Sequence, residues 1–291
     1  MSDKTKGALS LFIAAYSFSL YGVYSKFIAS DFGPVFQTVA RSFICVLAFG
    51  VLAYFFKSLK KIQPEDFKYY LLQGIFSLFV NIFFYIAVIK LPMGTTFFTF
   101  YAASLIASFI FGSVFLSEKL NKVKMIALIL AVLGIFCMFQ DKLIISSSVF
   151  IVTAIMAGSF FGLYTSISKK ISSKYSVLQI NFVMYLSNLI LTIPMLFLAG
   201  ENVSASISQF SWLIIFLYAL TSIASGYFVI YGFKHLEAQI SSLIMLGEIV
   251  FAVANGIIFF REIPTVMVLI GGLFILTAMI IPNLQFEKET K

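Results

Sequence analysis

The chain is short of the residues that most enzymes use for chemistry. Its 291 residues include one histidine, His235, and two cysteines, Cys45 and Cys137. No His-x-x-x-His, Cys-x-x-Cys or P-loop pattern occurs, so zinc, haem and ATP chemistry have no support and we predict no cofactor. Both cysteines lie within apolar runs, which favours small core residues over a disulfide or a metal pair.

Charged residues are scarce as well. They make up 11% of the chain, against roughly 25% in soluble domains, while 61% of the residues are hydrophobic. A chain of this composition cannot cover itself with a polar surface. Its apolar runs of about 20 residues are long enough to cross a bilayer as helices, and they are continuous rather than alternating. The sequence therefore predicts an all-α integral membrane protein, with the lipid bilayer as its surroundings.

Short polar breaks divide the chain into ten expected spans. We place them at 7–28, 34–56, 68–90, 94–116, 123–140, 148–169, 178–199, 211–233, 237–260 and 264–282. The net charge of +8 does not indicate nucleic acid, because the lysines sit in the short connections between the spans. Lysine in such connections orients a membrane protein.

The lysines predict one orientation. With a cytoplasmic amino terminus, only Lys26, Lys90, Lys142 and Arg261 fall in outer connections. Arg41 lies inside a span, and all the remaining basic residues fall on the inner side: Lys4, Lys6, Lys57, Lys60, Lys61, Lys68, Lys119, Lys122, Lys124, Lys169, Lys170, Lys174, Lys234, Lys288 and Lys291. This bias follows the positive-inside rule, so we expect both termini in the cytoplasm of a cell whose inner membrane holds the chain.

Two halves of the chain repeat each other. A shift of 143 positions superposes residues 14–30 on residues 157–173. The identical pairs are Ala14/Ala157, Phe18/Phe161, Leu20/Leu163, Tyr21/Tyr164, Ser25/Ser168, Lys26/Lys169, Ile28/Ile171 and Ser30/Ser173. At a shift of 144, the stretch Gly112 to Glu118 matches Gly256 to Glu262. We expect one membrane domain made of two repeats, 1–145 and 146–291.

Each repeat holds five spans, which is an odd number. The two copies therefore enter the membrane in opposite directions, giving ten transmembrane helices as two inverted five-helix repeats. Inverted repeats are the usual basis of alternating access in secondary transporters.

The motifs resemble those of the ten-helix EamA family of the drug/metabolite transporter superfamily. Each repeat closes its fourth span with an apolar run into Gly-x5-Glu, Gly112/Glu118 and Gly256/Glu262, followed by a fifth span with Gly134 or with Gly271 and Gly272. The stretch LGEIVFAVANGIIFFRE is similar to the family's ninth helix, although Glu248 is followed here by isoleucine where the family commonly has proline. The resemblance implies a carrier of metabolites or drugs and leaves the substrate open. It also implies that the fifth and tenth spans pack at the periphery.

Polar side chains recur on single faces of the spans. Ser241, Glu248 and Asn255 are seven residues apart, with Met245 on the same face. The third span carries a similar stripe at intervals of four: Gln73, Ser77, Asn81 and Tyr85. Residues at these spacings are neighbours on a helix. They either line a cavity or hydrogen-bond packed helices to each other, and the sequence leaves both interpretations open.

Glu248 and Arg41 are the two charges that lie several residues from either end of their spans. An anionic carboxylate near the middle of a span is costly, so we expect Glu248 to be neutral, paired or in contact with cavity water. We interpret it as a site residue that carries a proton or meets a cationic part of the substrate, which is compatible with proton coupling. Three roles are open for Arg41. Its side chain can pair with Glu248, attract an anionic group such as a carboxylate, or extend outward to the membrane interface.

Tyrosines complete the predicted pocket, because their ring faces hold flat rings and organic cations. The expected substrate-binding residues are Tyr21, Gln73, Ser77, Asn81, Tyr85, Tyr101, Ser104, Tyr164, Ser225, Tyr227, Met245 and Glu248. We predict a bacterial inner-membrane secondary transporter, a monomer or homodimer, that moves a small amino acid or amine-like solute and is not an enzyme acting on it. A lipid-headgroup flippase and a membrane-embedded enzyme are the alternatives.

Overall fold

The computed structural model describes residues 2–28, 30–91, 93–140, 148–201, 208–261 and 263–288. These residues form helices α1 (Asp3–Ile28), α2 (Pro34–Phe55), α3 (Pro64–Lys90), α4 (Met93–Phe115), α5 (Lys122–Phe139), α6 (Ser148–Ser172), α7 (Val177–Ala199), α8 (Gln209–His235), α9 (Ala238–Met245), α10 (Gly247–Phe260) and α11 (Val266–Lys288). Each expected span falls on a helix, and the ninth is shared by α9 and α10. Within the described residues, eight spans have the length and apolar composition needed to cross a membrane, and α11 adds the shorter apolar stretch Val266–Pro282.

The ninth span is interrupted at Leu246, although the proline of similar sequences is absent. The Leu246 N–H donates to the Leu243 carbonyl, and the Ile249 N–H donates to the Leu246 carbonyl, so the chain tightens to three-residue hydrogen bonds at this point. A continuous helix was expected over 237–260. Instead, a second helix begins at Gly247, and Glu248 lies in its first turn.

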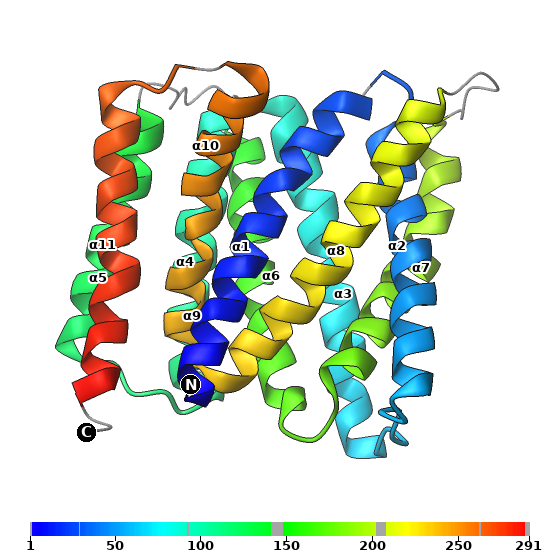
Figure 1. Ribbon diagram of the computed structural model, residues 1–291, viewed down its shortest axis with the longest axis horizontal. Coiled ribbons are helices and arrows are strands. Elements are labelled where there is room, and N and C mark those ends of the chain that lie inside the picture. The colour runs from blue at the N-terminus through cyan, green and yellow to red at the C-terminus, as the bar shows by residue number, and fades with distance from the viewer. Residues whose placement is uncertain are drawn as a thin grey trace.

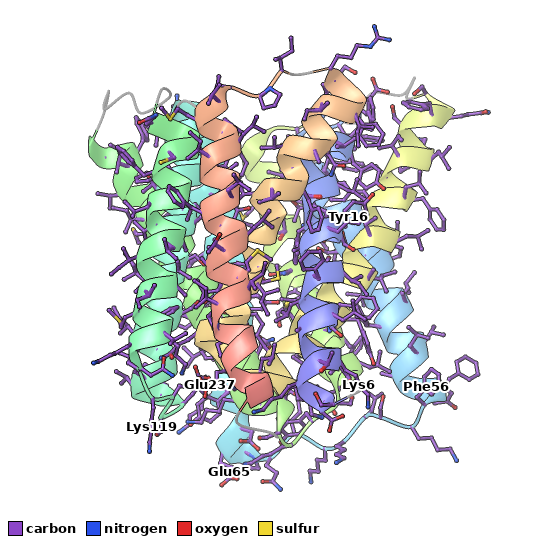
Figure 2. The ribbon with its side chains drawn as sticks, turned by 60° about the vertical axis from the view of Figure 1, so that its left-hand side comes forward. Lys6, Tyr16, Phe56, Glu65, Lys119 and Glu237 are labelled. Carbon is purple, nitrogen blue, oxygen red and sulfur yellow. The ribbon has the colours of Figure 1, made fainter. Side chains whose placement is uncertain are left out.

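The two halves run in opposite directions. Figure 1 shows α1 leaving the end of the bundle where the amino terminus lies, while α6, its counterpart in the second half, runs toward that end. Helix α11 ends at the end of the bundle where α1 begins. Charged side chains gather there, including Lys6, Glu65, Lys119 and Glu237 (Figure 2).

Helix pairing follows the same inversion. Helix α1 packs along α8, and α6 packs along α3 in the corresponding pair. Helix α4 lies against α6, just as α9 and α10 lie against α1. The pairs α2–α7 and α5–α11 each join equivalent helices of the two halves. Figure 1 places the α5–α11 pair at one edge of the bundle, as the resemblance implied.

The backbone repeats where sequence identity has been lost. Lys57 and Gly200 both have positive φ, 49° and 63°, and lie 143 positions apart. Ser117 and Arg261, with φ of 55° and 54°, lie 144 positions apart. These are the two shifts found in the sequence. Left-handed backbone is rare outside glycine, so its recurrence at equivalent helix ends is independent support for the duplication.

Glycines bring two helix pairs into close contact. A Cβ on Gly158 of α6 would lie 2.2 Å from the Phe100 carbonyl oxygen of α4, and one on Gly162 would lie 2.9 Å from the Ser104 oxygen. Helices α5 and α11 meet similarly, because a Cβ on Gly271 would lie 2.4 Å from the Gly134 oxygen. Small residues four apart allow helix backbones to approach in membranes. The close contact at Gly134 thus lies within one chain.

Candidate functional site

A cluster of tyrosines surrounds Arg41 of α2. Its guanidinium carbon lies 5.0 Å from the ring centroid of Tyr21 on α1 and 4.9 Å from that of Tyr218 on α8. The two rings contact each other edge to face at 4.7 Å. The Tyr21 hydroxyl shares a 2.7 Å hydrogen bond with the Ser225 hydroxyl, which is fully buried. We call Arg41, Tyr21, Tyr218 and Ser225 the arginine cluster.

Two further tyrosines extend this cluster. Tyr164 and Tyr185 each lie close enough to Tyr21 to interact with it electrostatically. The Tyr185 hydroxyl donates to the Ser222 carbonyl at 3.1 Å, one turn from Ser225 on α8. The repeat-related tyrosines Tyr21 and Tyr164 are thus brought together where the two halves meet, as a shared pocket requires.

Glu248 lies in a second polar region, beside α4. Its hydrogen-bonding neighbour is the hydroxyl of Tyr101, whose side chain is buried. Glu248 lies two residues after the three-residue hydrogen-bond step at Leu246, in the first turn of α10. Met245 is buried on the last turn of α9, and Ser104 is buried on α4. The structure groups Tyr101 and Glu248 and keeps them apart from the arginine cluster.

Glu248 and Arg41 form no ion pair. The described carboxylates include none within salt-bridge distance of Arg41, and the hydrogen-bonding neighbour of Glu248 is Tyr101 of α4. Figure 1 shows α2 and α10 on opposite sides of α1 and α8. Pairing between the two charges, one of three options from the sequence, is therefore ruled out in this conformation.

The polar stripe of the third span joins helices. The Gln73 amide donates to the Ser168 hydroxyl of α6 at 2.8 Å, and the Ser77 hydroxyl accepts from the Asn188 amide of α7 at 3.0 Å. Asn81 donates to the Ser77 carbonyl of its own helix. These contacts match the packing interpretation of the stripe. The side chain of Tyr85 lies outside the described residues.

Tyr227 lies on another face of α8, stacked on Tyr231 with ring centroids 6.0 Å apart. It lines a groove of about 500 Å³ between α2, α7 and α8. The lining is apolar: Phe49, Leu52, Phe56, Leu178, Ile223, Ala224, Tyr227 and Phe228. Tyr227 thus lines this groove and packs against the hydrophobic group of Tyr164 and Tyr185, whereas Arg41 rests on the rings of Tyr21 and Tyr218.

A charged cluster closes the end of the bundle that holds the amino terminus. Glu118, after α4, accepts hydrogen bonds from the N–H groups of Ala238 at 2.6 Å and Gln239 at 3.1 Å, which open α9. Lys169 of α6 donates to the same carboxylate at 2.8 Å and also to the Leu236 carbonyl. We call these groups the Glu118 cluster. The cluster ties Glu118 to the second half, and Gly112 leaves room for its carboxylate, since a Cβ on Gly112 would lie 2.7 Å from it.

Glu262 lies outside the described residues, as does the side chain of Lys26, which corresponds to Lys169. The geometry of Glu118 fits a gating role, because a single carboxylate holds three segments together.

Sequence analysis missed one member of the arginine cluster, Tyr218. A signal was present, because Tyr218, Ser222 and Ser225 recur at intervals of four and three on one face of α8. It also missed the Gly158-x-x-x-Gly162 spacing that lets α4 and α6 meet.

The arrangement of two inverted halves around buried polar groups agrees with comparison to known proteins. The profile of the EamA-like transporter family matches residues 5–140 and again residues 148–284, so each half matches it separately. The chain belongs to the EamA-like transporter family. The EamA family is part of the drug/metabolite transporter superfamily, and its members transport small solutes and are not enzymes.

The fold agrees with this assignment. A solved structure described only as the crystal structure of a protein aligns over 99% of this chain and 99% of its own, with a TM-score of 0.79 and 14% identity. At that identity the likeness shows a shared fold. Among curated proteins, none matches the chain. This EamA protein is thus a multi-pass membrane transporter built from ten transmembrane helices in two inverted repeats.

Proposed function

We propose that this EamA protein is a secondary transporter that moves a small metabolite, an amino acid or an amine-like solute, across a bacterial inner membrane by alternating access. The observation that carries the proposal is Glu248, a carboxylate near the middle of the ninth span with a phenol beside it. Ionisable groups inside spans mark substrate and ion pathways.

Alternating access needs one end of the bundle closed while the other opens. The Glu118 cluster supplies a closure on the amino-terminal side, since its bonds join α6, the end of α4 and the start of α9. On the proposed orientation this is the cytoplasmic side. The site would then be reached from outside until these bonds part.

Weakening the Glu118 cluster should favour the form open to the cytoplasm. Hydrogen bonds to charged groups contribute about 1.5–3 kcal/mol, so Glu118→Gln should shift the equilibrium roughly tenfold or more. Ser241, a fully buried hydroxyl on α9 without a partner among described residues, offers a reporter. With Cys45 and Cys137 replaced by alanine, Ser241→Cys should react about tenfold faster with a water-soluble maleimide in inside-out vesicles when Glu118→Gln is present.

Glu65→Gln is the matched control. Glu65 also pairs with a lysine at this end, Lys174, but both side chains are at least half exposed, so the bond contributes little. Equal labelling rates in the two variants would show that the Glu118 cluster is structural and not a gate.

Purified protein in liposomes tests the function itself. Uptake of labelled amino acids, the corresponding amines and a short-chain lipid should be compared with and without an imposed pH gradient. We expect uptake of an amino acid or amine to respond to the gradient. Lipid movement without solute uptake would support the flippase alternative and overturn the proposal.

The apolar groove is the feature that a flippase would use. Its lining residues include no lysine or arginine, and a lipid phosphate would need such a partner. The groove therefore fits an acyl chain of the surrounding bilayer better than a headgroup route, and solute transport remains the proposal that the site supports best.

A further inference from the structure

Arg41 is a half-buried cation whose neighbours are neutral. Its Nε is buried without a hydrogen-bond partner among the described residues, and the groups near enough to interact electrostatically are tyrosines and Cys45. We propose that the Arg41 guanidinium binds the carboxylate of the transported solute. The inference rests on the proposed function and narrows its substrate class to solutes that carry a carboxylate.

Two other roles for Arg41 do not fit its surroundings. It does not neutralise Glu248, because Glu248 contacts Tyr101 of α4 and no ion pair joins the two charges. It also does not reach outward to headgroups. Its guanidinium carbon lies 5.0 Å from the ring of Tyr21 on α1 and 4.9 Å from the ring of Tyr218 on α8, so the group rests against two contacting rings where these helices meet.

The rings alone do not compensate the burial of this charge. A cation over an aromatic face gains about 2 kcal/mol when desolvated. Taking an ion out of water costs several kcal/mol, and hydrogen bonds must satisfy the remaining N–H groups. A guanidinium has five N–H donors in a planar fork, which two ring faces leave free at its edge. An anion approaching in the plane of the fork would meet those donors.

The charge balance favours a carboxylate over a phosphate. Arg41 is one positive charge, and the surrounding groups are hydroxyls, such as the Tyr21–Ser225 pair, rather than further cations. A carboxylate brings one negative charge and matches the fork with two parallel hydrogen bonds. A phosphate group brings about −1.5 to −2 and would leave an excess negative charge in the bundle.

The composition of the chain allows a direct test. It has two arginines, Arg41 and Arg261, and Arg261 is exposed at the end of α10. The substitution Arg261→Lys therefore leaves Arg41 as the one target for phenylglyoxal, which modifies guanidinium groups. Peptide mass spectrometry then reports the rate of modification at Arg41 in the full-length protein in liposomes.

Three sets of probe compounds test which chemical group Arg41 binds. One arm contains the proteinogenic amino acids with pyruvate and benzoate, the second contains the corresponding amides, and the third contains inorganic phosphate. We expect the carboxylates to slow modification about tenfold when present at ten times Kd, by mass action, while amides give no protection. Equal protection by amides, stronger protection by phosphate, or no modification of Arg41 under any condition would overturn the inference.

A transport measurement separates this inference from the proposed function. Uptake of an amine that lacks a carboxylate, unaffected by Arg41→Gln, would leave the transporter proposal standing and refute the role of Arg41. Conversely, carboxylate protection in a protein that moves no solute would support the Arg41 site and refute transport. Arg41→Lys should retain less than a tenth of carboxylate uptake, because an ammonium cannot make the two parallel bonds.

Discussion

Replacing Glu248 with glutamine should reduce pH-driven solute uptake in liposomes to the level of protein-free liposomes. Glutamine keeps the size of the side chain and the contact with the Tyr101 hydroxyl, but it has no charge and cannot exchange a proton. If the carboxylate carries a proton or meets a cationic part of the solute, both roles are lost. Because the variant remains well packed, its yield and elution profile in detergent should match those of the parent.

Glu65→Gln is the control, because it makes the same chemical change at a site outside the proposed binding region. The Glu65 side chain is 68% exposed at the end of the bundle. This variant should transport at the parental rate. Unchanged uptake and unchanged pH dependence in Glu248→Gln would identify Glu248 as a structural carboxyl and remove the basis of the proposed function.

Gly158→Ala should destabilise the protein by separating α4 from α6. The added methyl would lie 2.2 Å from the Phe100 oxygen and 2.9 Å from the Ser104 nitrogen, and both are backbone atoms that cannot turn aside. Overpacking of this kind costs about 1–3 kcal/mol, and Gly158→Leu should prevent recovery of folded protein. The midpoint of thermal unfolding in detergent, read by size-exclusion chromatography after heating, measures the effect.

Gly22→Ala is the matched control, because Gly22 lies in α1 where an added methyl would meet no atom within 4 Å. It should leave the midpoint unchanged or raise it slightly, as alanine favours helix over glycine. Equal midpoints for the two variants would contradict the close α4–α6 contact.

Span positions and their inversion could be read from the sequence because both depend on composition. Hydrocarbon thickness sets the length of each apolar run, and the odd number of spans in each repeat fixes opposite directions. The repeat-related tyrosines Tyr21 and Tyr164 lie close to each other in the structure. A pattern repeated in both halves therefore predicts proximity at their interface.

Contacts between particular side chains were beyond the sequence. A polar stripe shows which face of a helix is polar but not what packs against that face. Gln73 and Ser77 were therefore equally compatible with a cavity lining and with a helix interface. The change of hydrogen bonding at Leu246 could not be predicted either, because no proline lies there. Arg41 and Glu248 have opposite charges inside their spans, but their separation by α1 and α8 depends on packing that spacing does not encode.

Labelling at repeat-related positions tests most directly whether the two halves are inverted. Lys119 and Ile263 each follow the glutamate that the two repeats share, and both are exposed. In a background with Cys45 and Cys137 replaced by alanine, Lys119→Cys and Ile263→Cys would be treated with a membrane-impermeant maleimide. We expect Lys119→Cys to react only in inside-out vesicles and Ile263→Cys only in intact cells. Reaction of both from the same side would contradict the inversion and the alternating access built on it.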